Sequence, residues 1–416
     1  MNRSAKPLST IEEDACRWLE QQQTEMESRL WHLANINSGS YNLDGLAQVA
    51  QTLVEWAEPL NCEISYIDLQ PQVMINAKGQ SVSQPLGRAL KLRQRPQAPL
   101  QVFLCAHMDT VFALDHPFQQ VQQLDAEHIN GPGVADLKGG IMVMLYALQA
   151  LEASPLTESI GWTVLFNPDE EIGSPSSAQL FPQLAQDHHL GLIYEPCFAD
   201  GNLAGERKGS GNFSTISHGK AAHAGREHHL GRNAIRAMAD FVRAVDQLNG
   251  QRAGVTINVG IIEGGNATNV VPNTCVMKFN IRTQQPDDEL WCKEQLQSII
   301  ADINQSDGIS IELHGHFGRT PKVMTPAWQK LCDLLQACGQ SLQIPIDFVA
   351  TGGCCDGNNL AAAGLPNIDT LGVQGGNIHS DQEYMRLASL SEKAKLSALL
   401  LLRLAAAGPE LWSPDK

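Results

Sequence analysis

The amino-acid sequence predicts an α/β protein with a smaller α+β unit inserted into it. Short apolar runs suited to buried strands alternate with stretches of helical periodicity on both sides of the middle of the chain. Between them, roughly a hundred residues read as a β-α-β-β-α-β sequence, which is typical of a ferredoxin-like unit. We therefore expect a discontinuous mixed-sheet domain over residues 1–207 and 321–416, and an inserted domain over residues 208–320.

The composition narrows the classes of function. The chain has 416 residues, with 29 Lys plus Arg against 45 Asp plus Glu, and a formal net charge of −16. Nucleic acids and anionic membranes bind basic surfaces, so neither is an expected partner. Residues 1–21 lack the apolar core of an export signal, and no later run approaches the length of a membrane span. Ten irregularly spaced cysteines indicate reduced thiols, which predicts a cytoplasmic protein.

The first hundred residues read as two helices, a strand pair and a connection. Apolar residues recur at helical spacing over residues 10–35 and again over residues 43–60. Residues 61–77 read as a pair of strands, and residues 78–99 read as a polar connection that contains proline and glutamine.

A buried strand over residues 100–106 ends in His107, with Asp109 two residues further on. Side chains alternate along an extended segment, so residues two apart share a face and Asp109 can reach the outer ring nitrogen of His107. A carboxylate in that place fixes the tautomer of a metal-bound imidazole and raises its basicity. The pair therefore suggests a metal ligand and its supporting carboxylate, although a single pair is weak evidence.

A glycine-rich turn over residues 130–140 leads into an apolar helix over residues 141–151. The turn lacks the Gly-Lys-Ser/Thr ending of a phosphate-binding loop, which excludes nucleotide binding there. Asp136 lies just before the helix, where an aspartate commonly caps the helix N-terminus. A role as a metal ligand is compatible with capping.

Further ligand-type side chains follow other predicted strands. These strands cover residues 160–166, 192–194 and 368–373. They are followed in turn by the acidic cluster 169–171, by Glu195 and by His379. Ligands in open α/β sheets gather at the carboxyl ends of the strands, so we expect these side chains to lie near His107.

The inserted unit and the end of the chain complete the pattern. Strands of the inserted unit are predicted over residues 212–218, 255–262, 275–282 and 309–316, and helices over residues 233–248 and 287–303. The α/β pattern resumes with a helix over residues 327–338, a glycine-rich turn over residues 351–357 and a closing helix over residues 390–406.

The strand ends together supply a set of ligands for zinc, namely His107, Asp136, Glu171, Glu195 and His379. Zinc binds imidazole nitrogen and carboxylate oxygen, and one carboxylate can bridge two ions. The set would therefore give each of two zinc ions three protein ligands and leave positions open for water. Hydrolysis also requires a base to move a proton, and Glu170 is the candidate because it adjoins Glu171.

The sequence resembles the di-zinc metallopeptidase family of glutamate carboxypeptidase, acetylornithine deacetylase and succinyl-diaminopimelate desuccinylase. The resemblance rests on five motifs in order: His107-x-Asp109, Asp136-x-Lys-Gly-Gly, Glu170-Glu171-x-Gly-Ser, Tyr-Glu195-Pro and His379-Ser-Asp. It implies a bridging Asp136, with His107 and Glu195 on one Zn²⁺ and Glu171 and His379 on the other. It also implies Glu170 as general base and a cis peptide bond after Asp136. Co²⁺ or Mn²⁺ could replace the two Zn²⁺.

The same resemblance implies that the inserted domain is a lid and the contact of a homodimer. Segment 221–225 is similar to a family motif whose histidine, here His223, reaches across the dimer and stabilises the oxyanion in the partner's active site. Asn269, Arg282 and Gly353 match positions that hold the substrate. A guanidinium can form two hydrogen bonds with a carboxylate, so Arg282 is the candidate for binding a free C-terminal carboxylate.

Two departures from the family pattern bear on specificity. Family members that prefer glutamate often carry a lysine soon after the third carboxylate motif, whereas residues 199–205 contain none, so glutamate specificity stays open. Cys354 and Cys355 stand where a small residue and a serine are common. They are either small residues of a tight turn, a thiol nucleophile or a further metal site.

The predicted activity is zinc-dependent hydrolysis of an amide bond in a small molecule or peptide with a free carboxylate, as in a glutamate-carboxypeptidase-like exopeptidase. An N-acyl amino acid deacylase would share every catalytic residue, and only the side-chain pocket would separate the two. A catalytically silent dimeric binding protein is a third interpretation, but none of the expected residues is missing.

Overall fold

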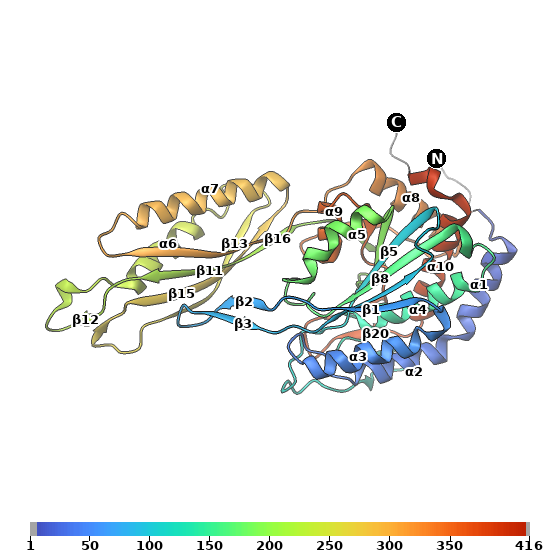
Figure 1. Ribbon diagram of the computed structural model, residues 1–416, viewed down its shortest axis with the longest axis horizontal. Helices are drawn as coiled ribbons and strands as arrows, with labels where there is room; N and C mark the ends of the chain where they lie inside the picture. Colours follow the sequence, from blue (N-terminus) through green and yellow to red (C-terminus); the bar gives the residue numbers. More distant parts are fainter. Residues whose placement is uncertain (1–5, 413–416) are drawn as a thin grey trace.

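The computed structural model describes residues 6–412, which form a larger α/β unit and a smaller α+β unit side by side along the longest axis (Figure 1). The α/β fold class predicted from the sequence is confirmed. The ends of the predicted domain ranges, residues 1–5 and 413–416, lie outside the described residues. Within residues 6–412, no helix combines the length and the apolar character needed to cross a membrane.

The larger unit is built on a six-stranded mixed sheet. Its strand order is β1 (Glu63–Ile67), β4 (Ala89–Gln94), β8 (Ile160–Asn167), β5 (Leu100–His107), β9 (Leu190–Ile193) and β18 (Asn367–Ile368). The last four strands run parallel, whereas β1 and β4 are antiparallel to their neighbours. The carboxyl ends of β5, β8 and β9 therefore lie at one edge of the sheet.

Helices cover both faces of this sheet, which explains why residues 102–106 of β5 are all apolar. Along β5, Val102 and Leu104 face the large core, whereas Phe103 and Cys105 face the small one. The large core is shared with α1 (Thr10–Gln21), α2 (Gln23–Ala34), α3 (Leu43–Trp56), α4 (Lys138–Glu152), α8 (Pro326–Ser341) and α10 (Ser389–Ala407). The small core is shared with α5 (Phe181–Asp187) and α9 (Asp356–Ala362).

Three helices open the chain, so the prediction of two is wrong. The stretch 10–35 divides into α1 and α2 at Gln22. The backbone N–H of Gln22 bonds to the carbonyl of Leu19, three residues back, which tightens the turn and redirects the chain. Both helices pack on the same large core, so apolar spacing continues across the break and does not reveal it.

The prediction for residues 61–99 is also wrong in its pairing. The two strands expected within 61–77 exist, but β1 pairs with β4, and β2 (Gln72–Ile75) pairs with β3 (Ser81–Gln84). The stretch expected to be a polar connection therefore contains two strands. Leu90 and Leu92 of β4 are buried, and they alternate with the charged Lys91 and Arg93, which obscured the strand.

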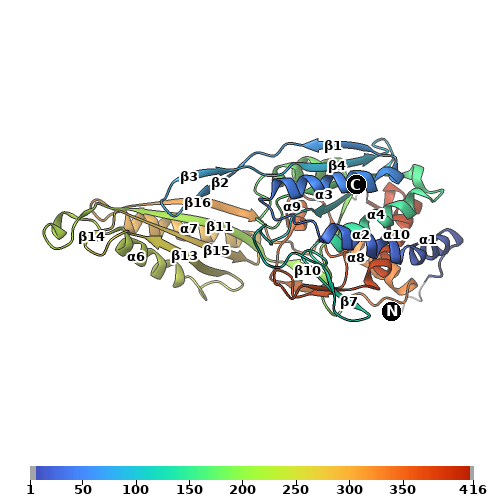
Figure 2. The ribbon, with the colours of Figure 1, turned by 90° about the horizontal axis from the view of Figure 1, so that it is seen from below.

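The hairpin β2–β3 reaches from the larger unit to the smaller one (Figures 1 and 2). Ile75 packs against Ile216 and Val276 of the smaller unit. At the tip, Gly79 has a φ of +74° and lies so close that an added Cβ would come within 3.0 Å of the Ile216 side chain. The hairpin is thus a contact between the two units that the sequence did not indicate.

The smaller unit has the predicted β-α-β-β-α-β order. Its elements are β11 (Gly209–His218), α6 (Ala234–Asp246), β13 (Thr256–Gly264), β15 (Thr274–Thr283), α7 (Pro286–Ile303) and β16 (Ser310–Arg319). The four strands pair antiparallel in the order β13-β15-β11-β16. Phe213 and Phe279 point to the core under α6, while Ile216 and Val276 face the hairpin on the other side. At the end of this unit that lies away from the larger unit, β12 (Ala222–His223) pairs with β14 (Val270–Val271) (Figures 1 and 2).

Smaller sheets tie distant parts of the chain together. The strand predicted over 368–373 is shorter than expected, because β18 ends at Ile368. After it, β19 (Gly375–Gly376) and β20 (Tyr384–Arg386) form a four-stranded sheet with β7 (His128–Asn130) and β6 (Gln122–Gln123). The sequence also did not indicate β10 (Leu203–Arg207), which pairs parallel with β17 (Phe348–Thr351). These pairings bring the turn that precedes α4 beside the segment that carries His379.

Candidate active site

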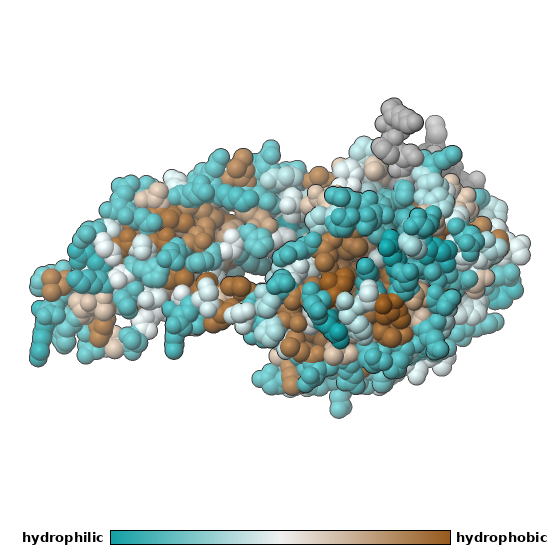
Figure 3. Space-filling view, viewed as in Figure 1, coloured by the Kyte–Doolittle hydropathy of each residue, from teal (hydrophilic) through white to brown (hydrophobic). Residues whose placement is uncertain are grey.

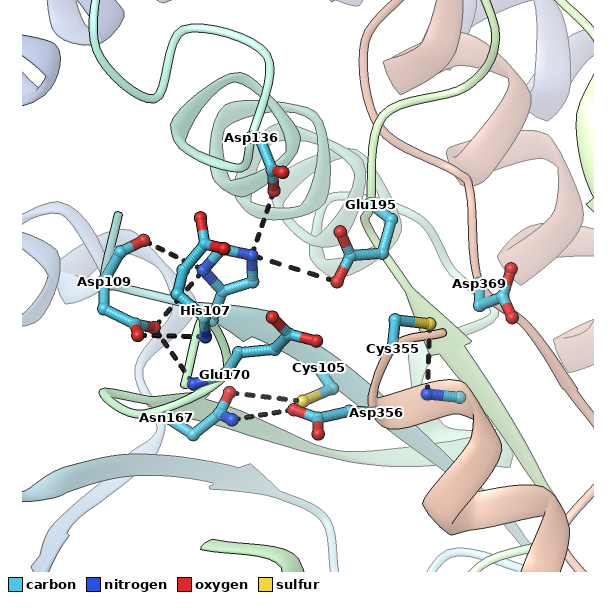
Figure 4. A network of polar contacts seen from close by, with 12 residues as sticks. Cys105, His107, Asp109, Asp136, Asn167, Glu170, Glu195, Cys355, Asp356 and Asp369 are labelled. Atoms are coloured by element: carbon cyan, nitrogen blue, oxygen red, sulfur yellow. Dashed lines mark hydrogen bonds and ion pairs between the residues drawn. The ribbon is translucent and has the colours of Figure 1, made fainter. Parts of the chain in front are cut away.

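The predicted metal ligands converge at the carboxyl edge of the main sheet. The Nε2 atom of His107, at the end of β5, lies 3.1 Å from Oδ1 of Asp136 and 3.9 Å from Oε1 of Glu195. The Nε2 atom of His379 lies 3.2 Å from Oδ2 of Asp136 and 3.2 Å from Oε2 of Glu171. Figure 4 shows the His107 ring pointing at both Asp136 and Glu195.

Asp136 stands between the two imidazoles, with one carboxylate oxygen toward each ring. This is the geometry that a bridging carboxylate needs. The peptide bond after Asp136 is cis, as the resemblance implies. Ligand atoms of His107, Asp136 and Glu171 all lie within 4.8 Å of one another, close enough to hold one metal ion.

The residues fit a divalent metal on two further grounds. Imidazole nitrogen and carboxylate oxygen are the donors that zinc and neighbouring transition metals take in proteins. The Oε1 atom of Glu195 is buried and has no hydrogen-bond partner among the described residues, although buried polar atoms are normally paired. A cation beside His107 would satisfy this oxygen.

The predicted ligands form one cluster, and burial dominates its electrostatics; the cluster consists of His107, Asp136, Glu171, Glu195 and His379. Burial raises the pKa of Glu171 to about 8, with the neighbouring charge of Asp136 adding to the effect, and it raises the pKa of Glu195 well above its usual range. Burial alone would raise the pKa of Asp136 as well, but hydrogen bonds from His107 and His379 hold it below its usual range. A bound cation favours the charged form of every one of these carboxylates.

Asp109 reaches the His107 ring, as predicted, and it also supports the site in a second way. The Nδ1 atom of His107 lies 2.9 Å from the backbone carbonyl oxygen of Asp109 and 3.4 Å from its carboxylate. The carbonyl therefore holds the ring in the tautomer that leaves Nε2 free for a metal. The carboxylate also accepts hydrogen bonds from the backbone N–H groups of Glu170 and Glu171 and from the Ser40 hydroxyl, at 3.2, 3.1 and 2.7 Å. Asp109 thus fixes the turn that carries the predicted base and a predicted ligand.

Glu170, the predicted base, lies beside the cluster and is buried. Its Oε1 atom is 2.6 Å from Nη2 of Arg319, a residue that the sequence analysis did not single out. Burial raises the pKa of Glu170 to about 7, although the positive charge of Arg319 opposes that rise. A carboxylate whose pKa is close to neutral is well suited to accept and return a proton.

A cavity of about 1350 Å³ lies between the two units, next to the cluster. Asp136, Glu170, Glu171 and His379 line it, and so does the hairpin over residues 71–75. Figure 3 shows hydrophobic surface where the hairpin meets the smaller unit, and an opening between the two units. The cavity is large enough for a dipeptide or an acylated amino acid.

Guanidinium groups also line this cavity. Arg282 and Gly353, two of the predicted substrate-binding residues, line the cavity together with Arg207 and Arg319. The Nη1 atom of Arg282 lies 3.1 Å from the sulfur of Cys354, and Nη1 of Arg319 donates to the carbonyl of Cys354 at 3.4 Å. Arg282 and Arg319 therefore converge on one place, which suits an anionic group of a substrate.

The structure favours a structural role for Cys355. Its sulfur accepts a hydrogen bond from the N–H of Gly357 at 3.3 Å and caps the N-terminus of α9. Burial raises the pKa of its thiol well above the usual range, so it is a poor nucleophile and a poor metal ligand. Cys354 lies between arginines with no second cysteine sulfur or imidazole bonded to it among the described residues.

Two predicted residues lie away from this site. His223 and Asn269 are exposed at the β12–β14 end of the smaller unit and do not line the cavity. They lie beside each other, because the N–H of Ala224 donates to the Asn269 carbonyl at 2.9 Å. Within one subunit the structure does not bring them to the metal cluster, so their roles stay predictions.

Comparison with known proteins identifies the family. Residues 103–403 match the sequence profile described as peptidase family M20/M25/M40, which covers most of the chain and all five predicted ligands. The chain belongs to this peptidase family. It is therefore a hydrolase of a metallopeptidase family, as the motifs indicated.

Individual members of the family show the range of related activities. Carboxypeptidase G2 of Pseudomonas sp. (strain RS-16) is 26% identical over 385 residues, covering 90% of this chain and 88% of that protein. Succinyl-diaminopimelate desuccinylase of Verminephrobacter eiseniae is 27% identical over 279 residues, 62% of this chain and 66% of that protein. The crystal structure of an M20 family metallo-carboxypeptidase from Sulfolobus solfataricus superposes with a TM-score of 0.69 at 15% identity, covering 91% of this chain and 98% of that one. That last likeness concerns the fold alone.

Sequence reasoning missed Arg207, Arg319 and Glu383, which all lie at or beside the site. Arg319 is the last residue of β16 and Arg282 the last but one of β15, and this similar position was the one available signal. Glu383 lies four residues after His379, just beyond the His379-Ser-Asp motif. Nothing local distinguishes these side chains from solvated charges, because their partners are distant in the sequence.

Proposed function

We propose that this protein is a metal-dependent exopeptidase that hydrolyses the amide bond next to a free carboxylate in a small substrate, in the manner of a glutamate carboxypeptidase. The observation that carries the proposal is Asp136 between His107 and His379, with Glu170 beside it and arginines lining the same cavity. The similarity to Carboxypeptidase G2 over 90% of the chain supports it.

His107 and Glu195 would hold one Zn²⁺, Glu171 and His379 the other, and Asp136 would bridge them; Co²⁺ or Mn²⁺ would suit the same ligands. Ions bound there would acidify a water molecule and polarise the carbonyl of the substrate. Glu170 would take the proton of the attacking water at its carboxylate and return it to the leaving amine. Asp109 keeps Glu170 in place through the backbone hydrogen bond to its N–H group.

Arg282 and Arg319 would orient the substrate by pairing with its carboxylate. The guanidinium of Arg319 already binds the carboxylates of Glu170 and Asp356, at 2.6 and 3.4 Å, which fixes its position. Arg282 has fewer partners and lies half-buried in the cavity wall, so it can offer N–H groups to a substrate. Gly353 would let the substrate backbone approach closely, since it carries no side chain.

Deacylation of an N-acyl amino acid is the second candidate. The desuccinylase relative favours it, and the proposed catalytic residues suit both reactions. Residues 199–205 contain no lysine, which leaves the preference for glutamate open. The side chains that surround the acyl and amino-acid portions of the substrate would decide between the two.

We further propose a cytoplasmic homodimer in which His223 and Asn269 of each subunit complete the other's site. All ten cysteines are free, which agrees with a reducing compartment. The exposed position of His223, away from its own cavity, supports a role in a second subunit. The edge strand β13 offers unpaired backbone groups together with the exposed side chains of Ile261 and Ile262, which is suitable for joining another copy.

The direct test is amine release from a panel of N-acetyl, N-succinyl and N-benzoyl amino acids and dipeptides, with added Zn²⁺ and with a chelator. We expect one substrate group to be cleaved and the chelator to stop the reaction. The responding group distinguishes the exopeptidase from the deacylase. Cleavage that is unaffected by full removal of metal, or the absence of any cleavage by a protein loaded with two ions, would contradict the proposal.

A further inference from the structure

The buried carboxylate of Glu383 lies beneath the turn that carries Asp136. Its Oε1 atom accepts hydrogen bonds from the backbone N–H groups of Ala135 and Asp136 at 2.9 and 3.0 Å. Its Oε2 atom accepts from the N–H of Gly133 at 3.2 Å. One side chain therefore binds three amides of the turn.

These amides depend on Glu383. Gly133, Ala135 and Asp136 are buried, and no other acceptor is recorded for their N–H groups among the described residues. A buried backbone N–H without a partner is strongly unfavourable, so the carboxylate favours this one conformation of the turn. Asp136 is part of the same turn. The position of its side chain between the imidazoles of His107 and His379 therefore depends on the conformation of that turn.

The backbone around Glu383 reinforces the contact. Its carbonyl oxygen accepts from the N–H of Gly131 at 3.3 Å and from the side-chain amide of Asn130 at 2.7 Å. The following residue, Tyr384, begins β20 and pairs with Asn130 in β7. The turn before α4 is thus fastened to this segment at both ends.

The same short segment also supplies a predicted ligand. His379 lies four residues before Glu383, and the N–H of Glu383 bonds to the carbonyl of Ser380 at 3.1 Å, which closes a tight turn between them. A displacement of this segment would move His379 and the Asp136 turn together. Asp109 has a comparable place on the other side of the site, where it binds the amides of Glu170 and Glu171.

We propose that Glu383 is a positioning residue of the metal centre: by binding three amides of the Asp136 turn, it holds the bridging carboxylate in register with His379. The inference rests on the proposed role of Asp136 as a bridging metal ligand. Glu383 touches neither substrate nor reacting atoms, and it acts through the geometry of Asp136. Groups that orient metal ligands in this way typically contribute a factor of about 10–100 in metal affinity.

The test compares Glu383→Ala, which removes all three hydrogen bonds, with Glu383→Asp, which keeps the charge but is too short to reach all three amides. The matched control is Glu392→Ala, because Glu392 is a nearby acidic residue that pairs with Arg386 and contacts no predicted ligand. Metal-free proteins are titrated with Zn²⁺ and with Co²⁺, and the visible spectrum of the Co²⁺ form reports ligand geometry. Circular dichroism checks folding.

We expect Glu383→Ala to weaken binding of at least one metal equivalent by about 10–100-fold and to alter the Co²⁺ spectrum, with Glu383→Asp intermediate and Glu392→Ala unchanged. Wild-type metal affinity and an unchanged spectrum in folded Glu383→Ala would overturn the proposal, even if its melting temperature fell. If Glu383→Ala does not fold, wild-type metal affinity and an unchanged Co²⁺ spectrum in Glu383→Asp would overturn the proposal instead. These titrations need no substrate, so a wild-type protein that binds two ions but cleaves nothing in the panel would contradict the proposed function alone.

Discussion

At the scale of single residues, the site depends on acidic side chains that lie next to one another and differ in what they contact. Glu170 meets Arg319 and the cavity, whereas Glu171 meets His379. The difference follows from the tight turn after β8, which Asp109 holds by its two hydrogen bonds to the backbone. Adjacent residues of the same type can therefore act as base and as ligand.

This difference gives a prediction for Glu170→Ala. The variant should lose turnover by a factor of about 10²–10⁴, which is the usual contribution of a general base. It should keep its metal, because Glu170 is not among the proposed ligands. Steady-state kinetics and metal analysis of the same preparation check both statements. Metal loss together with activity loss would show that Glu170 is itself a ligand.

The ring orientation of His223 is set locally as well. Its Nδ1 atom accepts hydrogen bonds from the backbone N–H groups of Gly225 and Arg226, at 3.1 and 3.2 Å. A neutral imidazole that accepts at Nδ1 carries its proton on Nε2. The exposed nitrogen is therefore a donor, which is what stabilisation of a negatively charged oxygen requires.

At the scale of elements, a buried group of charges joins three separate parts of the larger unit. Arg207 at the end of β10 lies 2.8 Å from Asp369, which follows β18, and Lys322 ahead of α8 lies 2.9 Å from the same carboxylate. All three side chains are buried. One carboxylate thus compensates two cations, and it holds the segments that frame the cavity.

Asp369→Asn should destabilise the protein by about 3–5 kcal/mol, because it leaves two buried cations without a counter-charge. Denaturant unfolding at neutral pH measures the loss. The matched control is Asp333→Asn on the exposed surface of α8, where we expect little change. A loss in Asp369→Asn no larger than that of the control would contradict this account.

The contribution of Asp369 should also depend on pH. Burial alone would raise the pKa of Asp369, but Arg207 and Lys322 hold it below its usual range. A carboxyl whose folded pKa is lowered stabilises the protein fully above its unfolded pKa of about 4, and this stabilisation is lost as the pH falls through the folded pKa. The stability difference between wild type and Asp369→Asn should therefore persist at neutral pH and shrink below about pH 4. A difference that grows on acidification would contradict this sign.

At the scale of the whole molecule, the predicted metal ligands belong to the larger unit, while Arg282 and Arg319 come from the smaller one. Residues of both units therefore line the cavity, and Arg319 of the smaller unit contacts the proposed base Glu170 of the larger one. The hairpin β2–β3 connects the two units through the contact of Ile75 with Ile216 and Val276. Any relative movement of the units must rearrange this contact.

The proposed sharing of each site between two subunits gives a prediction for mixed dimers. His223→Ala and Glu170→Ala should each be nearly inactive alone. In a mixed dimer, one site combines an intact Glu170 with an intact His223 from the partner, so co-refolding equal amounts should restore about a quarter of the wild-type activity per subunit. No recovery in mixtures shown to contain hybrid dimers would argue against sharing across the dimer.

The sequence by itself determined the fold class, the order of the inserted unit and the candidate ligands. His107 and Glu195 lie at or just after the ends of apolar strands, and strand ends of a parallel sheet meet at one edge, so local pattern was sufficient to propose their convergence. The tertiary structure alone decided the pairing of β1 with β4, the bridge made by the hairpin, and the partners of Arg319 and Glu383. Those contacts join residues far apart along the chain, and a charged side chain carries no local signal of whether it will meet solvent or a buried partner. Periodicity reports which face of an element is buried, but only packing decides what that face meets.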